Sequence, residues 1–151
     1  KAVTFKEIQE TLAHKQKNGK ELSQPNSQQE TPAWHFGIID FDSPWGWRFD
    51  SAPFWEKIFA ELRNFESMTW NEIYPGLSSG KTSHHPIKVE DFKMKNPEVL
   101  KRLKDINQND IESLFSLRLS GTERIFGIRD GRVLKILWYD PAHQVYPVEN
   151  K

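Results

Sequence analysis

The stretch Leu114–Tyr146, LFSLRLSGTERIFGIRDGRVLKILWYDPAHQVY, contains three runs of strand-forming residues separated by two turn signals. The second signal, Asp130-Gly131, is typical of a tight β-hairpin, because such turns need positive φ angles that Gly and Asp tolerate. The residues Ser120–Thr122 indicate another turn upstream. The stretch therefore predicts a three-stranded antiparallel meander near the end of the chain.

A two-residue Asp130-Gly131 turn also fixes the pairing of the last two predicted strands, since partners follow by counting outward from the turn. One face then carries three mixed pairs, Ile128 with Val133, Phe126 with Lys135 and Arg124 with Leu137. The other face carries three mostly apolar pairs, Gly127 with Leu134, Ile125 with Ile136 and Glu123 with Trp138. The apolar set is expected to face the core and the mixed set to face solvent. A β-bulge at Gly127 would move the residues of one strand beyond it to the opposite face.

The composition fits one folded domain with extensions. Of 151 residues, 36% are hydrophobic and 13% are aromatic, which is enough for a core built largely from Trp and Phe. Mean hydropathy is −0.72, and no apolar run is long enough to span a bilayer, so a cytoplasmic location is expected. The chain has no cysteine, which excludes disulfides, a thiolate nucleophile and a cysteine-type zinc site.

The formal net charge is zero, with 21 basic and 21 acidic residues. A dedicated nucleic-acid binder is usually basic overall. Any nucleic-acid role of this chain would therefore depend on a local basic patch.

Residues 1–32 are predicted to form a short helix and a polar linker ahead of a single domain at 33–151. The segment Thr4–Leu12 has apolar residues at helical spacing, with Thr4 as a plausible N-cap. This helix either packs on the domain or binds a partner. Residues 14–32 are rich in Lys, Gln, Asn and Ser, and this composition indicates a flexible linker.

The domain is predicted to begin with a strand over Ala33–Phe41, followed by aromatic residues that include Trp45 and Trp47. This aromatic cluster either forms part of the core or stacks on bases or sugars. Ser51 is expected to cap a helix that covers the sheet through a stripe of apolar residues, Trp55, Ile58, Phe59, Leu62 and Phe65.

Two further helical segments are indicated. One spans Met68–Tyr74 and has the spacing of a capping box between Thr69 and Glu72, and the other starts at Asn96. Together the elements predict an α+β fold, in which a small antiparallel sheet packs against two or three helices. The sheet is expected to contain the C-terminal meander and the N-terminal strand.

The polar loop Gly76–Pro86 contains Lys81, His84 and His85. Neighbouring histidines on a loop seldom bind one metal together, and no nearby carboxylate or Cys completes a ligand set. The Gly80–Thr82 triplet lacks the preceding Gly and the buried strand of a phosphate-binding loop. The loop residues are therefore either phosphate contacts, a loop base or solvated side chains.

The meander and its tail resemble the RelE/ParE-like toxins. The resemblance rests on four motifs, Leu117–Leu119, Arg124–Ile128, Val133–Asp140 and His143–Tyr146. It implies a toxin of a toxin–antitoxin-like system that acts as an endoribonuclease, often in the ribosome, without a metal or other cofactor. The expected partners are an antitoxin protein and RNA or the ribosome, and no membrane partner is expected.

Carried over to this chain, the resemblance implies a catalytic set made of Arg118, Arg124, Lys135, His143 and Tyr146. Arg can hold a phosphate through two parallel hydrogen bonds and stabilise developing charge, and His exchanges protons near neutral pH. The candidate substrate-binding residues are Lys81, His84, His85, Arg129 and Arg132. No metal ligand is expected.

Structural roles compete with these catalytic ones. The two strand arginines can form ion pairs with Glu112, Glu123 or Asp130, and Tyr146 can pack on Trp138. The carboxyl of Asp140, just before the tail, either raises the pKa of His143 or fixes a turn. The chain also departs from the toxin pattern by its N-terminal extension, the loop at 76–86 and its zero net charge.

A protein of another class also fits the sequence. The same fold can serve as a non-catalytic interaction module in which exposed aromatics and the N-terminal helix bind a protein partner. This hypothesis predicts a contiguous exposed patch drawn from the tryptophans Trp34, Trp45, Trp47 and Trp70.

Overall fold

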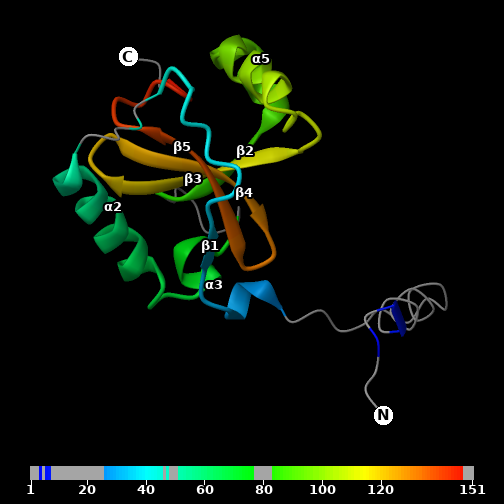
Figure 1. The fold of residues 1–151 in the computed structure, drawn as a ribbon, viewed down its shortest axis with the longest axis vertical. Coiled ribbons are helices and arrows are strands. Elements are labelled where there is room, and N and C mark those ends of the chain that lie inside the picture. Colours follow the sequence, from blue (N-terminus) through cyan, green and yellow to red (C-terminus); the bar gives the residue numbers. More distant parts are fainter. Residues whose placement is uncertain are drawn as a thin grey trace.

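A computed structural model describes residues 4, 6–7, 26–45, 47, 51–76 and 83–147. Its centre is a five-stranded mixed sheet with the strand order β1-β5-β4-β3-β2 (Figure 1). The strands are β1 (Ala33–His35), β2 (His85–Lys88), β3 (Ser113–Ser120), β4 (Glu123–Asp130) and β5 (Val133–Asp140). The predicted α+β class and the C-terminal antiparallel meander β3-β4-β5 are confirmed.

Helix α2 (Ala52–Phe65) begins where the sequence predicts. The Ser51 side chain accepts a hydrogen bond from the Phe54 amide, and a Pro occupies the first turn, where its missing N–H costs nothing. Three residues of the predicted apolar stripe, Ile58, Leu62 and Phe65, are buried against the sheet. The helix ends at Phe65.

The helices after residue 66 and the 3-10 turns of the described residues are short. They are α3 (Trp70–Ile73), α4 (Phe92–Lys95), α5 (Pro97–Asp105) and the 3-10 turns η1 (Ser27–Gln29) and η3 (Val89–Asp91). The predicted capping box at the start of α3 is confirmed, because Thr69 and Glu72 each bind the other's backbone N–H. No helix among the described residues is long and apolar enough to cross a membrane.

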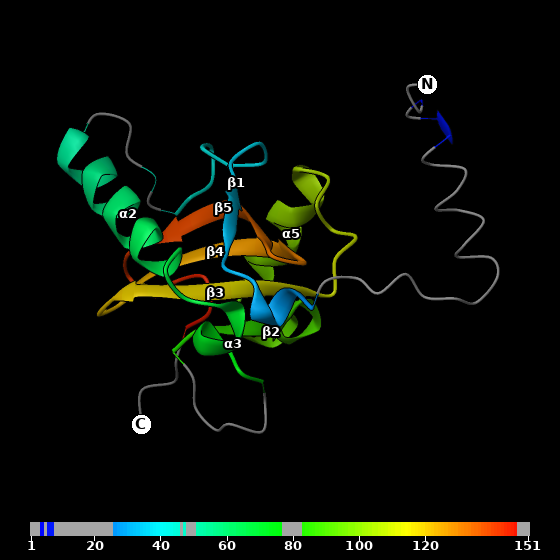
Figure 2. The same cartoon turned by 90° about the horizontal axis from the view of Figure 1, so that it is seen from below.

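The sheet is covered on both faces. Helices α2 and α3 pack on one face, over a cluster that includes Leu117, Ile125 and Ile136. Helices α4 and α5 and the tail residue Val145 cover the other face. Figures 1 and 2 show α2 and α5 on opposite sides of the sheet.

The prediction that one side of the meander faces solvent is therefore wrong. Phe126 and Leu137, both assigned to that side, are completely buried in the second cluster. The residues of the last strands are apolar on both alternations, and each face is covered by its own helices. Arg124, at one end of this face, and Ile128, Val133 and Lys135, toward the other end, keep partial exposure.

The predicted hairpin register is also wrong. The turn residues are Gly131 and Arg132, so Asp130 pairs with Val133 and Ile128 pairs with Lys135. Gly131 has a φ of 61°, which fits a turn with Gly at its first central position. The bulge considered at Gly127 is present, since the register shifts between Phe126 and Gly127.

Strand β1 makes the sheet mixed. It pairs parallel to β5, with Ala33 opposite Val133 and His35 opposite Lys135, whereas an antiparallel sheet was expected. A parallel pairing is possible because the long connection through α2, α3 and the other strands lets the chain return in the same direction. β1 ends at His35, well short of the predicted Phe41.

The segment after β1 is fixed by a buried ion pair. The Asp40 carboxylate accepts two hydrogen bonds from the Arg102 guanidinium, at 2.7 and 2.6 Å. It accepts a third from the Trp138 indole N–H at 2.9 Å. Burial raises the pKa of the Asp40 carboxyl, but these hydrogen bonds outweigh burial and hold the pKa below its ordinary value. Asp40 thus ties this segment to α5 and to β5.

Residues 26–32, expected to belong to the linker, pack on the domain. Arg132 forms an ion pair with Glu30 at 3.3 Å and donates to Thr31, while the Glu30 carbonyl accepts the Trp70 amide. The folded body therefore begins before the predicted boundary at residue 33. Most of the predicted N-terminal helix, and the linker as far as residue 25, lie outside the described residues.

Candidate anion-binding site

Two of the predicted catalytic residues lie side by side. Arg118 on β3 and Arg124 on β4 are cross-strand partners next to the β3–β4 turn. Both guanidinium groups donate to the same acceptor, the Gly121 carbonyl, with Arg118 Nε at 3.0 Å and Arg124 Nη1 at 3.1 Å. Gly121 has a φ of 52°, a conformation that Gly adopts at little cost, and it turns its carbonyl toward the pair.

Neither arginine of the pair forms an ion pair with a carboxylate among the described residues. Burial lowers the pKa of Arg124, and repulsion from Arg118 lowers it further, while Asp140 partly opposes the shift. Like charges directly opposite each other destabilise a sheet. An anion between the two groups would remove this repulsion.

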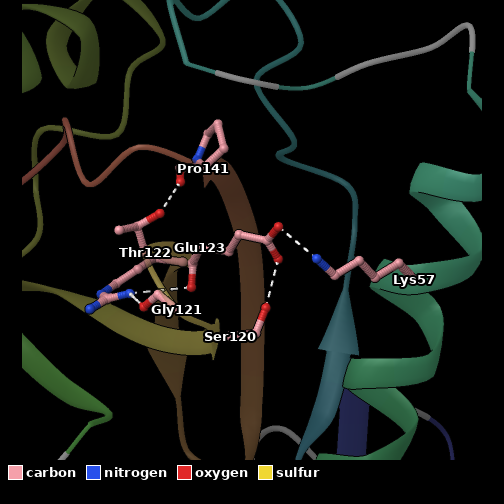
Figure 3. Close-up of polar contacts among 7 residues, drawn as sticks. Lys57, Ser120, Gly121, Thr122, Glu123 and Pro141 are labelled. Atoms are coloured by element: carbon pink, nitrogen blue, oxygen red, sulfur yellow. Dashed lines mark hydrogen bonds and ion pairs between the residues drawn. The ribbon is translucent and has the colours of Figure 1, made fainter.

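The carboxylate nearest in sequence, Glu123, is already used elsewhere. It forms an ion pair with Lys57 on α2 at 2.6 Å and accepts the Ser120 hydroxyl at 3.0 Å. Figure 3 shows Glu123 directed toward Lys57 and Ser120. Burial raises the pKa of Glu123, but Lys57, Ser120 and Tyr139 together hold it below its ordinary value. The ion pair considered between Glu123 and an arginine is therefore absent from this part of the structure.

His84 lies next to Arg118. Its Nδ1 accepts a hydrogen bond from the Arg118 amide at 2.9 Å, and its ring meets the edge of Phe65 with a centroid distance of 5.1 Å. Burial lowers the pKa of His84 to about 4, with further contributions from Arg118 and Arg124. The imidazole is thus neutral at physiological pH. Because Nδ1 is an acceptor, the proton of this neutral ring is on Nε2.

The tail after β5, residues 141–147, is anchored by hydrogen bonds to the side chain of Asp140. In the sheet, Asp140 is the cross-strand partner of Arg124. The completely buried Asp140 carboxylate accepts three backbone amides, those of Ala142 at 3.3 Å, Gln144 at 2.9 Å and Val145 at 2.7 Å. The Thr122 hydroxyl donates to the Pro141 carbonyl at 2.6 Å, a contact drawn in Figure 3. Two roles were considered for Asp140, and in the structure its side chain fixes the turn that follows β5.

The turn at Asp140 places His143 in an unusual conformation. His143 has a φ of 58°, and its buried Nδ1 has no hydrogen-bond partner in the described part of the chain. The partly exposed ring lines a surface hollow together with Trp45, Asn96 and Glu98.

Tyr146, the last member of the predicted catalytic set, is a packing residue. Its ring meets Phe92 at 5.4 Å between centroids, instead of the Trp138 ring considered from the sequence, and the Lys95 ammonium lies 5.8 Å from its centre. Trp138 packs on Trp45 instead, at 4.6 Å.

Three other predicted residues lie at the opposite end of the meander. Lys135 faces Asp130 at 3.9 Å, so this carboxylate lies beside Lys135 and not beside the strand arginines for which it was considered. Arg129 stacks over the Trp70 ring at 4.1 Å and donates to Gln28, and Arg132 binds residues 30 and 31. These arginines attach the segment at 26–31 to the hairpin. His85 lies in β2 opposite Ser116, and Lys81 lies outside the described residues.

The structure thus brings together Arg118, Arg124 and His84, with the His143 tail anchored at the same cross-strand row by Asp140. The anchoring role of Asp140 had a sequence signal, because an Asp side chain commonly accepts the amide two residues later. The contact between His84 and Arg118 had none, since it joins residues far apart in the chain. Within the described residues, no group of three or more His, Asp or Glu side chains is placed to hold a metal.

Two of the four tryptophans considered for the exposed patch of the interaction-module hypothesis are buried. Trp45 is 6% exposed and Trp70 is completely buried. Trp34 is only half-buried, packed against the α2 side of the core. Trp47 belongs to a chain of aromatic ring contacts that also includes the exposed side chains Phe36, Phe41 and Phe59.

Comparison with protein-family models, curated proteins and solved structures found no match to this chain.

Proposed function

We propose that this protein is a toxin of the toxin–antitoxin type that cleaves RNA without a metal, with Arg118 and Arg124 binding the scissile phosphate. The observation that supports this most strongly is the cross-strand pair of guanidinium groups without a carboxylate partner in the described part of the chain. A guanidinium forms short, strong hydrogen bonds to phosphate oxygens, and two of them can share one phosphate. The RNA specificity comes from the motif resemblance.

The chemistry needs few protein groups. The 2′-oxygen of the substrate attacks phosphorus, the bond to the 5′-oxygen breaks, and the products are a 2′,3′-cyclic phosphate and a 5′-hydroxyl. One proton leaves the 2′-hydroxyl and one reaches the 5′-oxygen. Negative charge grows on the phosphate oxygens in the transition state, where two fixed guanidinium groups stabilise it.

The neighbouring residues have separate roles in this proposal. His84 is neutral and its Nδ1 accepts the Arg118 amide, so it helps to position the Arg118 backbone rather than acting as a general acid. The proposal assigns proton transfer to His143, because its tail is anchored by Asp140, the cross-strand partner of Arg124. Lys135 and Tyr146 are left out, because Lys135 lies at the other end of the meander and Tyr146 packs on Phe92.

The test is cleavage of a fluorescent RNA by purified protein in the presence of EDTA, together with growth arrest on induced expression. Arg118→Ala and Arg124→Ala should each lower the cleavage rate by about 10²–10³-fold, as for loss of one transition-state donor. Lys101→Ala, an exposed cation on α5, is the matched control and should leave the rate unchanged. Circular dichroism confirms that each variant folds.

His143 requires a substitution suited to its backbone. His143→Asn keeps a residue type that tolerates positive φ while removing the imidazole, so it should fold and lose about 10²–10⁴-fold in rate. Cleavage that survives both arginine substitutions, or that requires Mg²⁺, would refute the proposal. Cleavage lost with the arginines and retained in His143→Asn would keep the phosphate site and remove His143 from the mechanism.

A further inference from the structure

A pocket on the α3 side of the sheet lies apart from the pair formed by Arg118 and Arg124. Its volume is about 380 Å³, and residues of η1, β2, β3, the β4–β5 hairpin and the end of α3 line it. Phe115 in its wall belongs to the core cluster beneath α2 and α3, whereas Arg118, three residues further along β3, faces the other side of the sheet. A pocket of this size suits a small molecule.

Arg129 is the one charged side chain among the described residues that line this pocket. It forms no ion pair with another described residue. The side chain is partly buried, and burial lowers the pKa of its guanidinium. A cation that is withdrawn from water without a counter-charge is costly, so an anion in the pocket would be favoured.

The Arg129 guanidinium is held in place before any ligand arrives. Its Nε donates to the Gly131 carbonyl at 2.9 Å and its Nη2 to the Gln28 side chain at 2.5 Å, while the group stacks over the Trp70 ring. Gln28 in turn donates to the Tyr74 carbonyl at 3.0 Å, and Figure 2 shows η1 beside α3. Nη1 has no acceptor in the described part of the chain. A fixed cation with a donor to spare lowers the entropy cost of binding.

The rest of the pocket wall combines two hydroxyls with an apolar surface. Ser27 and Ser113 line the pocket, and neither hydroxyl has a hydrogen-bond partner among the described residues. Tyr74 and Phe115, whose rings meet edge to face at 6.1 Å between centroids, supply the apolar part together with Pro86. A few polar groups set in an apolar wall are typical of a site for a small organic ligand.

The pocket continues into a second hollow of about 890 Å³, which shares Tyr74, Pro86 and Ser113 with it and adds the apolar residues Leu100 and Ile111. The shared wall contains the edge strand β2. Pro86 has no N–H to offer to an added strand, which disfavours a peptide paired along this edge. The second hollow therefore provides room for the apolar body of a small molecule.

We propose that this pocket binds a small organic acid, with its carboxylate on Arg129 and its apolar body against Tyr74 and Phe115. The hydroxyls of Ser27 and Ser113 complete the set of donors around the carboxylate. One guanidinium matches the single negative charge of a carboxylate, to which it forms short, strong hydrogen bonds. The site is separate from the proposed RNA site and does not depend on it.

The test is calorimetric titration of the full chain with benzoate, benzamide and inorganic phosphate. Benzoate should bind with a Kd of about 1 mM or tighter. Benzamide has the same shape without the charge and should bind at least about tenfold more weakly, because it loses the hydrogen bonds to a charged partner. Phosphate, which has no apolar body, should also bind more weakly than benzoate.

Three variants locate the binding. Arg129→Gln should weaken benzoate binding by about 10–100-fold, and Ser113→Ala by about 2–10-fold. Arg132→Gln is the matched control, because Arg132 attaches the same segment through Glu30 and Thr31 but does not line the pocket. Its affinity for benzoate should be unchanged, and circular dichroism checks that each variant folds.

Four outcomes would overturn the inference. Wild-type protein that does not bind benzoate at millimolar concentration has no such site. Benzamide or phosphate that binds as tightly as benzoate would show that the pocket does not select an organic anion. Equal binding by wild type and Arg129→Gln would place benzoate elsewhere. Equal losses in Arg129→Gln and Arg132→Gln would show that both arginines act only by holding the segment at 26–31.

Discussion

Replacement of Asp140 by Asn tests whether the tail is held by one buried carboxylate. The carboxylate accepts the amides of Ala142 and Gln144 on Oδ1 and that of Val145 on Oδ2. The side chain has no exposed surface, so water cannot replace a lost bond. Asn keeps one oxygen, but its NH₂ group must then face one of these amide donors.

The magnitude follows from these contacts. If the oxygen of Asn stays with Ala142 and Gln144, the Val145 amide loses its 2.7 Å bond and meets another donor. A hydrogen bond to a charged group contributes about 1.5–3 kcal/mol, and a buried unsatisfied donor costs about 1–3 kcal/mol. Because part of the loop can relax, we expect Asp140→Asn to lower the free energy of unfolding by about 2–4 kcal/mol. For a chain of this length, the melting temperature should fall by roughly 5–15 °C.

Urea denaturation and calorimetry at pH 7 measure the effect, and hydrogen exchange of the Gln144 and Val145 amides locates it. Asp130→Asn is the matched control. Asp130 is 77% exposed and lies 3.9 Å from Lys135, so the same chemical change should cost less than about 0.5 kcal/mol. If Asp140→Asn is as mild as Asp130→Asn, or if the two tail amides keep their protection, the reasoning about the tail is wrong.

Three further predictions concern single positions. Gly127→Ala should lower the free energy of unfolding by about 1–3 kcal/mol in urea denaturation, because its Cβ would lie 2.6 Å from the Lys135 carbonyl oxygen; an unchanged stability would contradict the close approach at the bulge. Thr69→Ala should cost about 1 kcal/mol by removing the capping box of α3, and a loss below about 0.3 kcal/mol would show that the box is dispensable. For His84, NMR titration should give a pKa of about 4. Since this lies below the value in the unfolded chain, the unfolded state binds the proton first, and stability should fall as the pH drops from about 6.5 toward 4. Full linkage corresponds to about 3 kcal/mol, reduced to about 1–2 kcal/mol by the partial exposure of the ring, and His84→Gln should remove this slope.

The local elements of this protein follow from short stretches of sequence. The caps at Ser51 and Thr69 appear where residue type and spacing predict them, and the β4–β5 turn lies within one residue of its predicted position. Each depends on hydrogen bonds within a few residues or on the conformational freedom of Gly. The meander itself is predictable for the same reason, since its two turns join strands that are adjacent in the chain.

The register of the meander is less predictable, because an Asp-Gly signal does not say which two residues occupy the turn. The structure uses Gly131 and Arg132, and it adds the bulge beside Gly127. Both choices depend on how side chains of β4 and β5 fill the two cores. The pattern of apolar and polar residues along one strand contains no information about the volume that the core offers on each face of the sheet.

In the candidate site, too, the features set by local sequence can be separated from those set by long-range packing. The sequence by itself determined that Arg118 and Arg124 lie on neighbouring strands, because the turn between them is local. Only the tertiary structure decided that His84 meets Arg118, that Tyr146 packs on Phe92, and that Arg129 stacks on Trp70. These contacts join segments that are distant in sequence. Their partners are selected by which helices cover which face of the sheet, and that selection depends on the packing of the whole domain.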